Sequence, residues 1–312
     1  MRGLVVTNMY PSEQRPELGG FVRDQVEALR ALGHEVDVFS FNPGGIGSYL
    51  RAGPALRRER RSQHYDVIHA HFGLSAWPSL FLRGAPHLVT LHGTDLAHPR
   101  SGPLSRAALP FISLAATVSA SLAARVPGAG RRRRVAVLPC GVDLERFSPM
   151  PRDEARRALG LDPERPLLLF PADPARAVKR FDRARELAGE IPLLTYGDVH
   201  PREVPLYINA ANAVLVTSDS EGFGLGALEA LACDVPVLST PVGIAPVALH
   251  ELPGTLCAPY DPATWRVALE PHLSAADARV AGRARAELFS ARRMAERVAV
   301  AWEAMAAEAS VN

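Results

Sequence analysis

The sequence predicts an α/β protein with two domains, each built on a parallel β-sheet with crossover helices. Two observations predict this class. Short apolar runs alternate with amphipathic helical stretches, which is the pattern of parallel strands joined by helices. The alternation stops once, over residues 141–165, and then begins again. A length of 312 residues, 47% of them hydrophobic, fits two domains of ordinary size.

The first half is expected to contain six strands, each a nearly continuous apolar run of the kind that is buried on both faces of a sheet. The clearest helix between them spans residues 20–32, where apolar side chains recur on one helical face and Gly33 provides a stop. The expected strands are residues 4–8, 35–40, 66–70, 87–91, 115–119 and 135–138.

The second half repeats the alternation after a segment of Pro, Asp and Arg that contains one short helix, residues 152–159. We therefore place an N-terminal domain at residues 1–145 and a C-terminal domain at residues 146–290. A C-terminal helix, residues 291–312, is expected to pack back toward the first domain. The expected strands of the second half are residues 167–170, 193–196, 213–216, 235–238 and 255–257.

The composition argues against a membrane-spanning or secreted protein. No stretch approaches the roughly 18 consecutive apolar residues of a spanning helix, and the apolar run at residues 4–7 is too short for a signal peptide. Cys140, Cys233 and Cys257 lie far apart and show no spacing typical of a metal site. A cytoplasmic protein is therefore expected.

The charges are distributed unevenly although the net charge is only +2. Residues 1–150 contain 18 arginines and no lysine against 11 acidic residues, so this half is basic and the rest is acidic. A basic half can meet an anionic partner. Of the 35 basic residues 34 are arginine, and the single lysine, Lys179, therefore stands out as a candidate functional residue.

The first candidate site follows the first predicted strand, where a polar loop leads to Gly19 and Gly20 at the start of the helix. Ligands of parallel sheets bind beyond the carboxyl ends of strands, beside helix N-termini that attract phosphate. Two glycines would let backbone N–H groups approach a ligand oxygen. A flexible turn explains the pair equally well, and the segment does not match the G-x-G-x-x-G pattern of dinucleotide sites.

Histidines near two other strand ends are the next candidates. His92 comes just after a strand, with Gly93 beside it, and a neutral imidazole there could donate to a phosphate or a sugar hydroxyl. His69 and His71 lie within or just after their strand, where a structural role is favoured. A metal role for this pair lacks a third ligand.

Arg176 and Lys179 follow the first strand of the second half, three residues apart, where we expect the first long helix to open. Both could point to one side and hold a diphosphate. The alternative is a solvated basic helix start. That alternative is disfavoured because cations at a helix N-terminus oppose the helix dipole.

The strongest pattern is the segment from Ser218 to Leu238. Glycines at 222, 224 and 226 would open backbone amides at a helix start. Glu221 precedes this helix and Glu229 lies about two turns inside it, so a single ligand could be contacted at two separate points. An exposed charged helix does not explain a glutamate within so apolar a segment.

These residues resemble glycosyltransferase family four, which has the two-domain GT-B architecture. The resemblance covers nearly the whole chain, and its opening, with residues 7–12 and 21–25, is similar to a branch that includes bacterial cell-surface polysaccharide enzymes of the teichuronic-acid type. It rests on Gly19-Gly20, Gly33-His34-Glu35-Val36, Leu91-His92-Gly93-Thr94-Asp95, Pro139-Cys140-Gly141-Val142-Asp143 through Phe147, and Glu221 with Glu229 eight positions apart.

The resemblance implies two Rossmann-like domains facing an interdomain cleft and retaining transfer of a hexose from a UDP- or GDP-linked sugar, without metal or cofactor. By the resemblance, Arg176 and Lys179 hold the diphosphate, and Glu229 binds the ribose. Same-face displacement is favoured because no carboxylate is an obvious nucleophile. The other implied contacts are Glu221, Phe223, Gly224 and Leu225 with the sugar, His92 with the sugar or a phosphate, and Gly19 and Gly20 with phosphate and the acceptor side.

The segment from Ile191 to Asn212 is shorter than is usual in the family, as though one βα unit were missing from the C-terminal domain. Contact with the base is expected at Gly197 and Val199. The acceptor is expected to be a glycan, a lipid-linked intermediate or a small molecule. The basic run Arg131, Arg132, Arg133 and Arg134 would dock on anionic lipid headgroups at the inner face of a membrane, whereas nucleic acid is not expected.

Two other functions remain open at this point. A catalytically silent GT-B subunit that binds a glycan intermediate is motivated by the shortened domain. Another GT-B enzyme, such as a nucleotide-sugar epimerase or a phosphorylase, is the second alternative.

Overall fold

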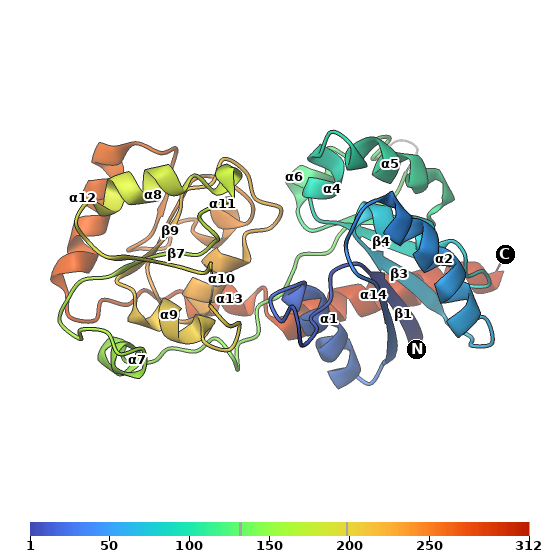
Figure 1. The fold of residues 1–312 in the computed structure, drawn as a ribbon, viewed down its shortest axis with the longest axis horizontal. Coiled ribbons are helices and arrows are strands. Elements are labelled where there is room, and N and C mark those ends of the chain that lie inside the picture. The colour runs from blue at the N-terminus through green and yellow to red at the C-terminus, as the bar shows by residue number, and fades with distance from the viewer. Residues whose placement is uncertain (131–132, 198, 312) are drawn as a thin grey trace. The chain divides into compact units, whose positions relative to one another are not determined.

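The computed structural model describes residues 1–130, 133–197 and 199–311. The chain divides into two compact units (Figure 1). Unit 1 consists of Met1–Gly141 together with Ala291–Asn312, and unit 2 consists of Val142–Ser290. Each unit has its own parallel sheet, which confirms the predicted α/β class.

The sheet of unit 1 has six strands in the order β2-β1-β3-β4-β5-β6, and all neighbouring pairs are parallel. From β1 the chain passes to β2 on one side and then to β3 on the other. The strand order therefore reverses between β1 and β3. The strands are β1 (Arg2–Thr7), β2 (Glu35–Ser40), β3 (Val67–His71), β4 (His87–Leu91), β5 (Leu114–Thr117) and β6 (Val135–Val137).

The two faces of this sheet are covered by different helices because successive side chains of a strand point to opposite faces. Val5 packs into a cluster with α1 (Gly20–Ala31) and α14 (Ala291–Val311). Leu4 and Val6 pack on the other face, against α2 (Ile46–Arg60). Figure 1 shows α14, in red, lying beside α1, in blue.

Gly3 allows the close packing of α14. A Cβ atom at this position would lie 2.4 Å from two ring atoms of Trp302, a fully buried residue of α14. The indole can therefore lie directly against β1. The remaining helices of unit 1 are short: α3 (Ala76–Ser79), α4 (Thr94–Ala97), α5 (Ser101–Ala108) and α6 (Ala120–Ala123), with 3₁₀ turns at Gly73–Ser75 and Leu109–Phe111.

The sheet of unit 2 has five parallel strands in the order β11-β10-β9-β7-β8. Here the order reverses between β7 and β9. The segment that the sequence marked as short contributes one helix, α9 (Val204–Ala210), between β8 and β9. The strands are β7 (Leu168–Phe170), β8 (Leu193–Thr195), β9 (Ala213–Val216), β10 (Val237–Ser239) and β11 (Leu256–Cys257).

One face of the unit 2 sheet is covered by α8 (Phe181–Ala188) and α12 (Pro262–Ser274), whose Trp265 is completely buried in the core. The helix α10 (Leu225–Ala232) lies against β9 and β10 and contacts α9 and α13 (Arg283–Glu287). The other helices are α7 (Arg152–Ala158) and α11 (Ala245–Ala248), with a 3₁₀ turn at Ala177–Lys179.

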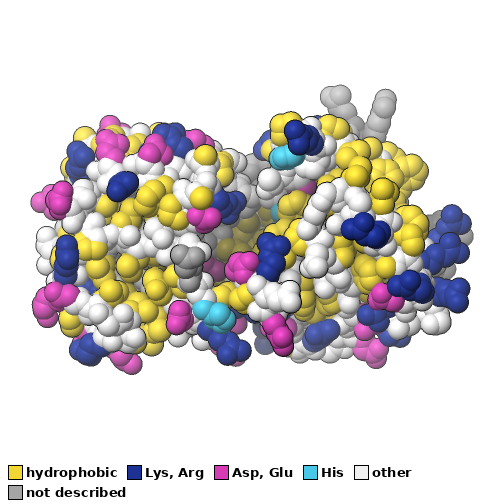
Figure 2. All heavy atoms as spheres, in the orientation of Figure 1, with side chains coloured by type: hydrophobic (Ala, Val, Ile, Leu, Met, Phe, Trp, Pro, Cys, Tyr) yellow, Lys and Arg dark blue, Asp and Glu magenta, His cyan; other side chains and the backbone are white. Residues whose placement is uncertain are grey.

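Within the described residues, no helix combines the length and the apolar character that crossing a bilayer requires. Figure 2 shows basic and acidic side chains interspersed over the visible face of each unit.

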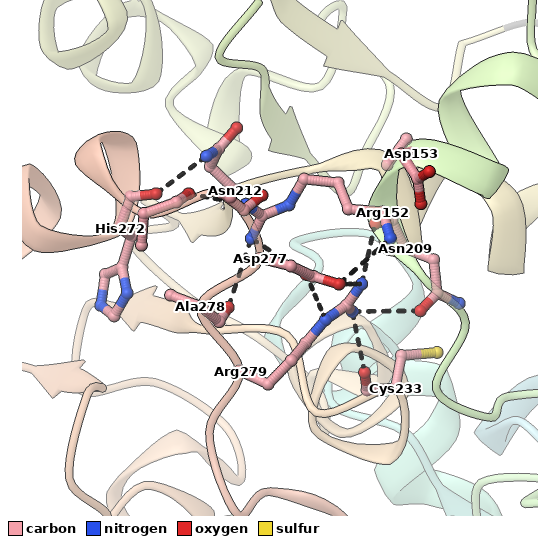
Figure 3. Close-up of polar contacts among 12 residues, drawn as sticks. Arg152, Asp153, Asn209, Asn212, Cys233, His272, Asp277, Ala278 and Arg279 are labelled. Carbon is pink, nitrogen blue, oxygen red and sulfur yellow. Dashed lines mark hydrogen bonds and ion pairs between the residues drawn. The ribbon is translucent and has the colours of Figure 1, made fainter. Parts of the chain in front are cut away.

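Two arginines, the buried Arg152 and the partly buried Arg279, join distant segments of unit 2 through backbone carbonyls (Figure 3). Arg152, only 2% exposed, donates from Nη1 to the carbonyls of Ala275 and Ala276 and from Nη2 to that of Ala278. Arg279 donates to the carbonyl of Cys233 and to Oδ1 of Asn209. Burial lowers the pKa of Arg152 to about 10, which leaves it charged at neutral pH. Each guanidinium thus ties its own segment to carbonyls of segments far away in the chain.

Replacing Arg152 by Met should destabilise unit 2 by about 3–5 kcal/mol, because the carbonyls at the end of α12 would lose their donors. Arg157, five residues along α7 and paired with Asp153 at 2.8 Å on the surface, provides the matched control. Arg157→Met should cost less than about 1 kcal/mol. Urea unfolding of both variants measures the difference, and equal losses would contradict a structural role for Arg152.

Candidate active site

Parallel sheets bind ligands beyond the carboxyl ends of their strands at the point where the strand order reverses. In unit 1 this point lies between β1 and β3, and in unit 2 it lies between β7 and β9. Most of the candidate residues predicted from the sequence follow these strands or their immediate neighbours.

Gly19 and Gly20 differ in what the structure requires of them. Gly19 precedes α1 with φ +71°, and a Cβ there would lie 2.3 Å from the carbonyl oxygen of Met9. Gly19 is therefore needed for the loop after β1 to pass close to the start of α1. Gly20 is the first residue of α1, and a Cβ there would meet only the end of Arg23 at 4.0 Å. The space beside the α1 N-terminus is thus open at Gly20.

The loop that carries His92 is held in place by Asp95. The carboxylate of Asp95 accepts hydrogen bonds from the backbone N–H groups of His92 and Gly93, and from that of Gly73 after β3. Asp95 is fully buried, and this burial raises its pKa although the N–H groups act in the opposite direction. Gly93 has φ +105°, a conformation that favours glycine. Asp95 therefore joins the loops after β3 and β4.

Three histidines that the sequence treated separately form a row across β3 and the end of β4. Nδ1 of His71 lies 3.2 Å from Nε2 of His92, and the ring centroids of His69 and His71 are 4.4 Å apart. His69 and His71 are buried, whereas His92 is partly accessible at the end of the row. The sequence favoured structural roles for His69 and His71 and did not anticipate the contact of His71 with His92.

The environment of the row keeps the imidazoles neutral. Burial lowers the pKa of His69 to about 3 and that of His92 to about 4. Burial, together with the neighbouring histidines, also lowers the pKa of His71 well below its usual range. A neutral His92, as expected from the sequence, can donate one hydrogen bond and accept another. Within the described residues no cluster of three or more His, Cys, Asp or Glu side chains is arranged to hold a metal ion.

In unit 2, Lys179 and Glu221 meet at the point where the strand order reverses. Nζ of Lys179 lies 2.6 Å from both carboxylate oxygens of Glu221, and the two side chains are 13% and 10% exposed. Ser218 donates to Oε1 of Glu221 at 2.7 Å. Thr217 donates to the carbonyl of Lys179 at 3.1 Å, so the loops after β7 and β9 are joined.

The expected helical position of Arg176 and Lys179 was wrong. The long helix α8 begins only at Phe181. Arg176 directly precedes a single 3₁₀ turn, Ala177–Lys179, and Lys179 is the last residue of that turn. Arg180 next to it adopts the left-handed conformation, φ +54°, and pairs with Asp182 and Asp219. The turn directs Lys179 toward Glu221. Arg176 is exposed, and its side chain forms no hydrogen bond or ion pair among the described residues.

The glycine-rich segment forms the tight start of α10. Gly224, with φ +91°, precedes the helix, and no side chain caps its first N–H groups. A Cβ at Gly226 would lie 3.0 Å from Pro171, so this glycine lets α10 approach the loop after β7. The carbonyl of Phe223 accepts a 2.7 Å hydrogen bond from the backbone of Ile244. An uncapped helix N-terminus of this kind favours an anion.

Glu229 lies on the second turn of α10, near a tyrosine that the sequence analysis missed. Burial and the charge of Glu229 raise the pKa of Tyr196 well above its usual range, and the Tyr196 hydroxyl is buried without a hydrogen-bond partner. Gly197 and Val199 follow directly, while Asp198 lies outside the described residues. The position of Tyr196 after β8 was the signal that could have identified it.

The depressed histidine pKa values predict a loss of stability in mild acid. The unfolded chain binds protons on these histidines below about pH 6.5, whereas the folded chain resists them until its lower pKa values are reached. The contribution of these histidines to the free energy of unfolding is therefore fully present above pH 6.5 and is lost as the pH decreases below it. His69 and His92 should each remove about 2 kcal/mol from the free energy of unfolding between pH 7.5 and pH 5.

Urea unfolding at both pH values tests this prediction, with His92→Gln as the comparison. The variant should lose about 2 kcal/mol less than the unmodified protein over the same pH change. The same loss in both proteins would show that His92 is not held neutral by burial.

Comparisons with known proteins agree with this geometry. Residues 19–146 match the model of Glycosyltransferase Family 4, and residues 173–286 match that of Glycosyl transferases group 1. The D-inositol 3-phosphate glycosyltransferase of Actinosynnema mirum is 31% identical over 297 residues, which cover 74% of this chain and 70% of the relative. The enzyme of the same name from Pseudarthrobacter chlorophenolicus is 30% identical, covering 73% and 67%.

Solved structures show the same fold at low sequence identity. Sucrose-phosphate synthase from Thermosynechococcus elongatus has a TM-score of 0.75 and 19% identity, covering 98% of this chain and 99% of that one. The Anabaena protein HepE in complex with UDP and glucose has a TM-score of 0.68 and 16% identity, covering 97% and 99%.

The predicted GT-B fold and the predicted family are thus confirmed, whereas the narrower resemblance to cell-surface polysaccharide enzymes stays a prediction. Two family models that together span most of the chain, and a relative above 30% identity, support one assignment. The chain belongs to glycosyltransferase family 4 and is a retaining glycosyltransferase that uses a nucleotide-sugar donor.

Proposed function

We propose that this chain transfers a hexose from a UDP- or GDP-linked sugar to a phosphorylated small-molecule acceptor, without a metal ion. The observation that carries the donor part is the contact between Lys179 and Glu221 where the strand order of unit 2 reverses. UDP is favoured because the structure of HepE, which has the same fold, contains UDP and glucose.

Lys179 holds the diphosphate in this proposal. An ammonium group has three N–H donors, and two of them are directed at Glu221, which leaves the third for a phosphate oxygen. The uncapped N-terminus of α10 adds backbone N–H groups beside it. Arg176, whose exposed side chain has no partner among the described residues, is long enough to add a second cation.

The two glutamates bind the sugar and the ribose. Glu221, oriented by Lys179 and Ser218, accepts hydrogen bonds from hexose hydroxyls next to the backbone of Phe223, Gly224 and Leu225. Glu229 accepts from the ribose hydroxyls. Gly197 and Val199 contact the base. Gly19 and Gly20 at the start of α1 remain proposed phosphate and acceptor contacts, and the open space at Gly20 favours this residue of the pair.

The proposed reaction is a displacement on one face of the sugar. The acceptor oxygen bonds to the anomeric carbon on the same face from which the diphosphate leaves, so the configuration is retained. A departing phosphate oxygen takes the acceptor proton, and Lys179 and Arg176 stabilise the negative charge that develops there. His92 donates a hydrogen bond to a sugar or phosphate oxygen.

The acceptor class is proposed from the relatives and from charge. The curated relatives described above are named for D-inositol 3-phosphate, a small phosphorylated polyol. The basic first half of this chain, with 18 arginines against 11 acidic residues, is suited to an anionic acceptor.

A lipid-linked acceptor is the second candidate, and it would use the predicted docking of Arg131–Arg134 on anionic headgroups. Arg131 and Arg132 lie outside the described residues. Arg133 donates to the carbonyl of Leu109, and Arg134 pairs with Glu308, so both are already engaged within unit 1. Co-sedimentation with anionic vesicles tests docking, and unchanged binding after neutralisation of all four arginines would exclude it.

Donor binding is the first test of the proposed function. Isothermal titration without added metal should show selective binding of one sugar among UDP-, GDP- and ADP-linked hexoses. Lys179→Ala and Glu229→Gln should each weaken it by about tenfold or more, because each removes a charged hydrogen bond to the donor. Glu190→Gln, at an exposed position two residues after α8, is the matched control and should bind normally.

If the folded protein binds none of these sugars, or if the control weakens binding as much as the site variants do, the assignment of the donor site fails.

Measuring turnover gives a second test, which distinguishes stabilisation of the leaving group's charge by Lys179 from simple binding of the donor. Lys179→Ala should lower kcat by about 10²–10³, since the group stabilises charge that develops only as the bond breaks. Lys179→Arg should recover only part of this loss, because the planar guanidinium does not replace a compact ammonium between two carboxylate oxygens. Full activity of Lys179→Ala with a bound donor would contradict its role at the leaving group.

A further inference from the structure

His92 stands at the end of a hydrogen-bonded chain that runs from Gln25 through His71, and neither of these two residues has an assigned role. Its Nε2 faces Nδ1 of His71 at 3.2 Å, and its Nδ1 forms no hydrogen bond within the described residues. A neutral imidazole carries its proton on one nitrogen only. The partner of Nε2 therefore decides whether His92 presents a donor or an acceptor to a ligand.

Gln25 determines which atom donates in each hydrogen bond between Gln25, His71 and His92. Nε2 of the Gln25 amide lies 3.0 Å from Nε2 of His71, and an amide NH₂ group can only donate. His71 Nε2 must then accept, so the His71 proton is on Nδ1 and is donated to Nε2 of His92. The remaining proton of His92 is on Nδ1. Gln25 and His71 are 6% and 2% exposed, so water does not compete freely for these bonds.

The proton of His69 is fixed by other partners, so His69 does not change which atoms donate between Gln25, His71 and His92. The indole N–H of Trp302 donates to Nδ1 of His69, and Nε2 of His69 then donates to the Thr90 hydroxyl at 2.8 Å. Both nitrogens of His69 are thus occupied. Its ring lies almost parallel to that of His71, with 27° between the planes, and holds that ring in position.

Helix α1 supplies the amide of Gln25 and one of the rings that pack against His92. Gln25 and Phe21 lie four residues apart, so they share one face of the helix. The Phe21 ring is 4.8 Å from the His92 ring, and Phe72 packs against that ring at 6.2 Å. The same helix therefore orients the His92 ring and, through Gln25, its proton.

We propose that Gln25 and His71 are positioning residues that fix the proton of His92 on Nδ1, so that His92 presents an N–H donor to an oxygen of the sugar or phosphate. This rests on the proposed function only in the identity of that oxygen. The opposite arrangement would present only an acceptor, which could take a hydrogen bond from a sugar hydroxyl but could not bind a phosphate oxygen. Because burial keeps these imidazoles uncharged, His92 carries a single ring proton. The position of that proton decides whether His92 donates a hydrogen bond to the ligand or accepts one.

Nitrogen-15 NMR of the intact protein, labelled at histidine, measures the proton position directly. At pH 7.5 the signals of His92, assigned by their loss in His92→Gln, should show a protonated Nδ1 and an unprotonated Nε2. A proton on Nε2, or a mixture of both forms, would overturn the proposal. This readout requires no substrate.

Variants test whether Gln25 is the cause. Gln25→Met keeps the volume but removes the donor, so His92 should become a mixture of both forms and kcat should fall roughly tenfold with donor KM little changed. Val26→Ala, a buried neighbour on α1, is the control for general loss of packing. It should lower stability while leaving the His92 signals and kcat unchanged.

The possible results distinguish this proposal from the proposed function. If His92 carries its proton on Nδ1 but no nucleotide sugar binds, the function fails and the row remains as described. If Lys179 and Glu229 bind the donor but Gln25→Met leaves the His92 signals unchanged, the positioning role fails alone.

Discussion

The reversal of strand order in each parallel sheet is the constraint on which the candidate site depends. Parallel strands end at one edge of a sheet, and the loops on either side of a reversal diverge, which leaves room for a ligand. In unit 2 this brings together Lys179 and Glu221, 42 positions apart in the chain, at 2.6 Å. In unit 1 it brings Gln25, on the helix after β1, within 3.0 Å of His71 at the end of β3, across 46 positions.

Polar groups at both points are held before any ligand arrives. Asp95 uses its buried carboxylate to fix two loops, and Ser218 and Lys179 orient Glu221. Burying such groups is unfavourable unless their hydrogen bonds are satisfied, so each network excludes alternative arrangements. Groups that do not need to reorganise during the reaction stabilise its charges most effectively.

Much of the fold could be predicted from local patterns, because buried parallel strands are continuous apolar runs and their order along the chain is visible. Glu221 and Lys179 were also identifiable, as a glutamate beside a glycine-rich helix start and as the only lysine. Their ion pair was not, since nothing local joins the two loops. The expected helix at Lys179 was wrong because Arg180 adopts a left-handed conformation. Gln25 was missed although a polar residue among the apolar positions of α1 was a usable signal.

The single lysine makes the central claim directly measurable. Protein labelled with carbon-13 at the lysine ε position should give one side-chain signal, that of Lys179. We predict that titration with UDP in the absence of metal shifts this signal and saturates together with broadening of the phosphorus signals of the nucleotide. A Lys179 signal that does not respond while UDP binds elsewhere on the folded protein would contradict the account.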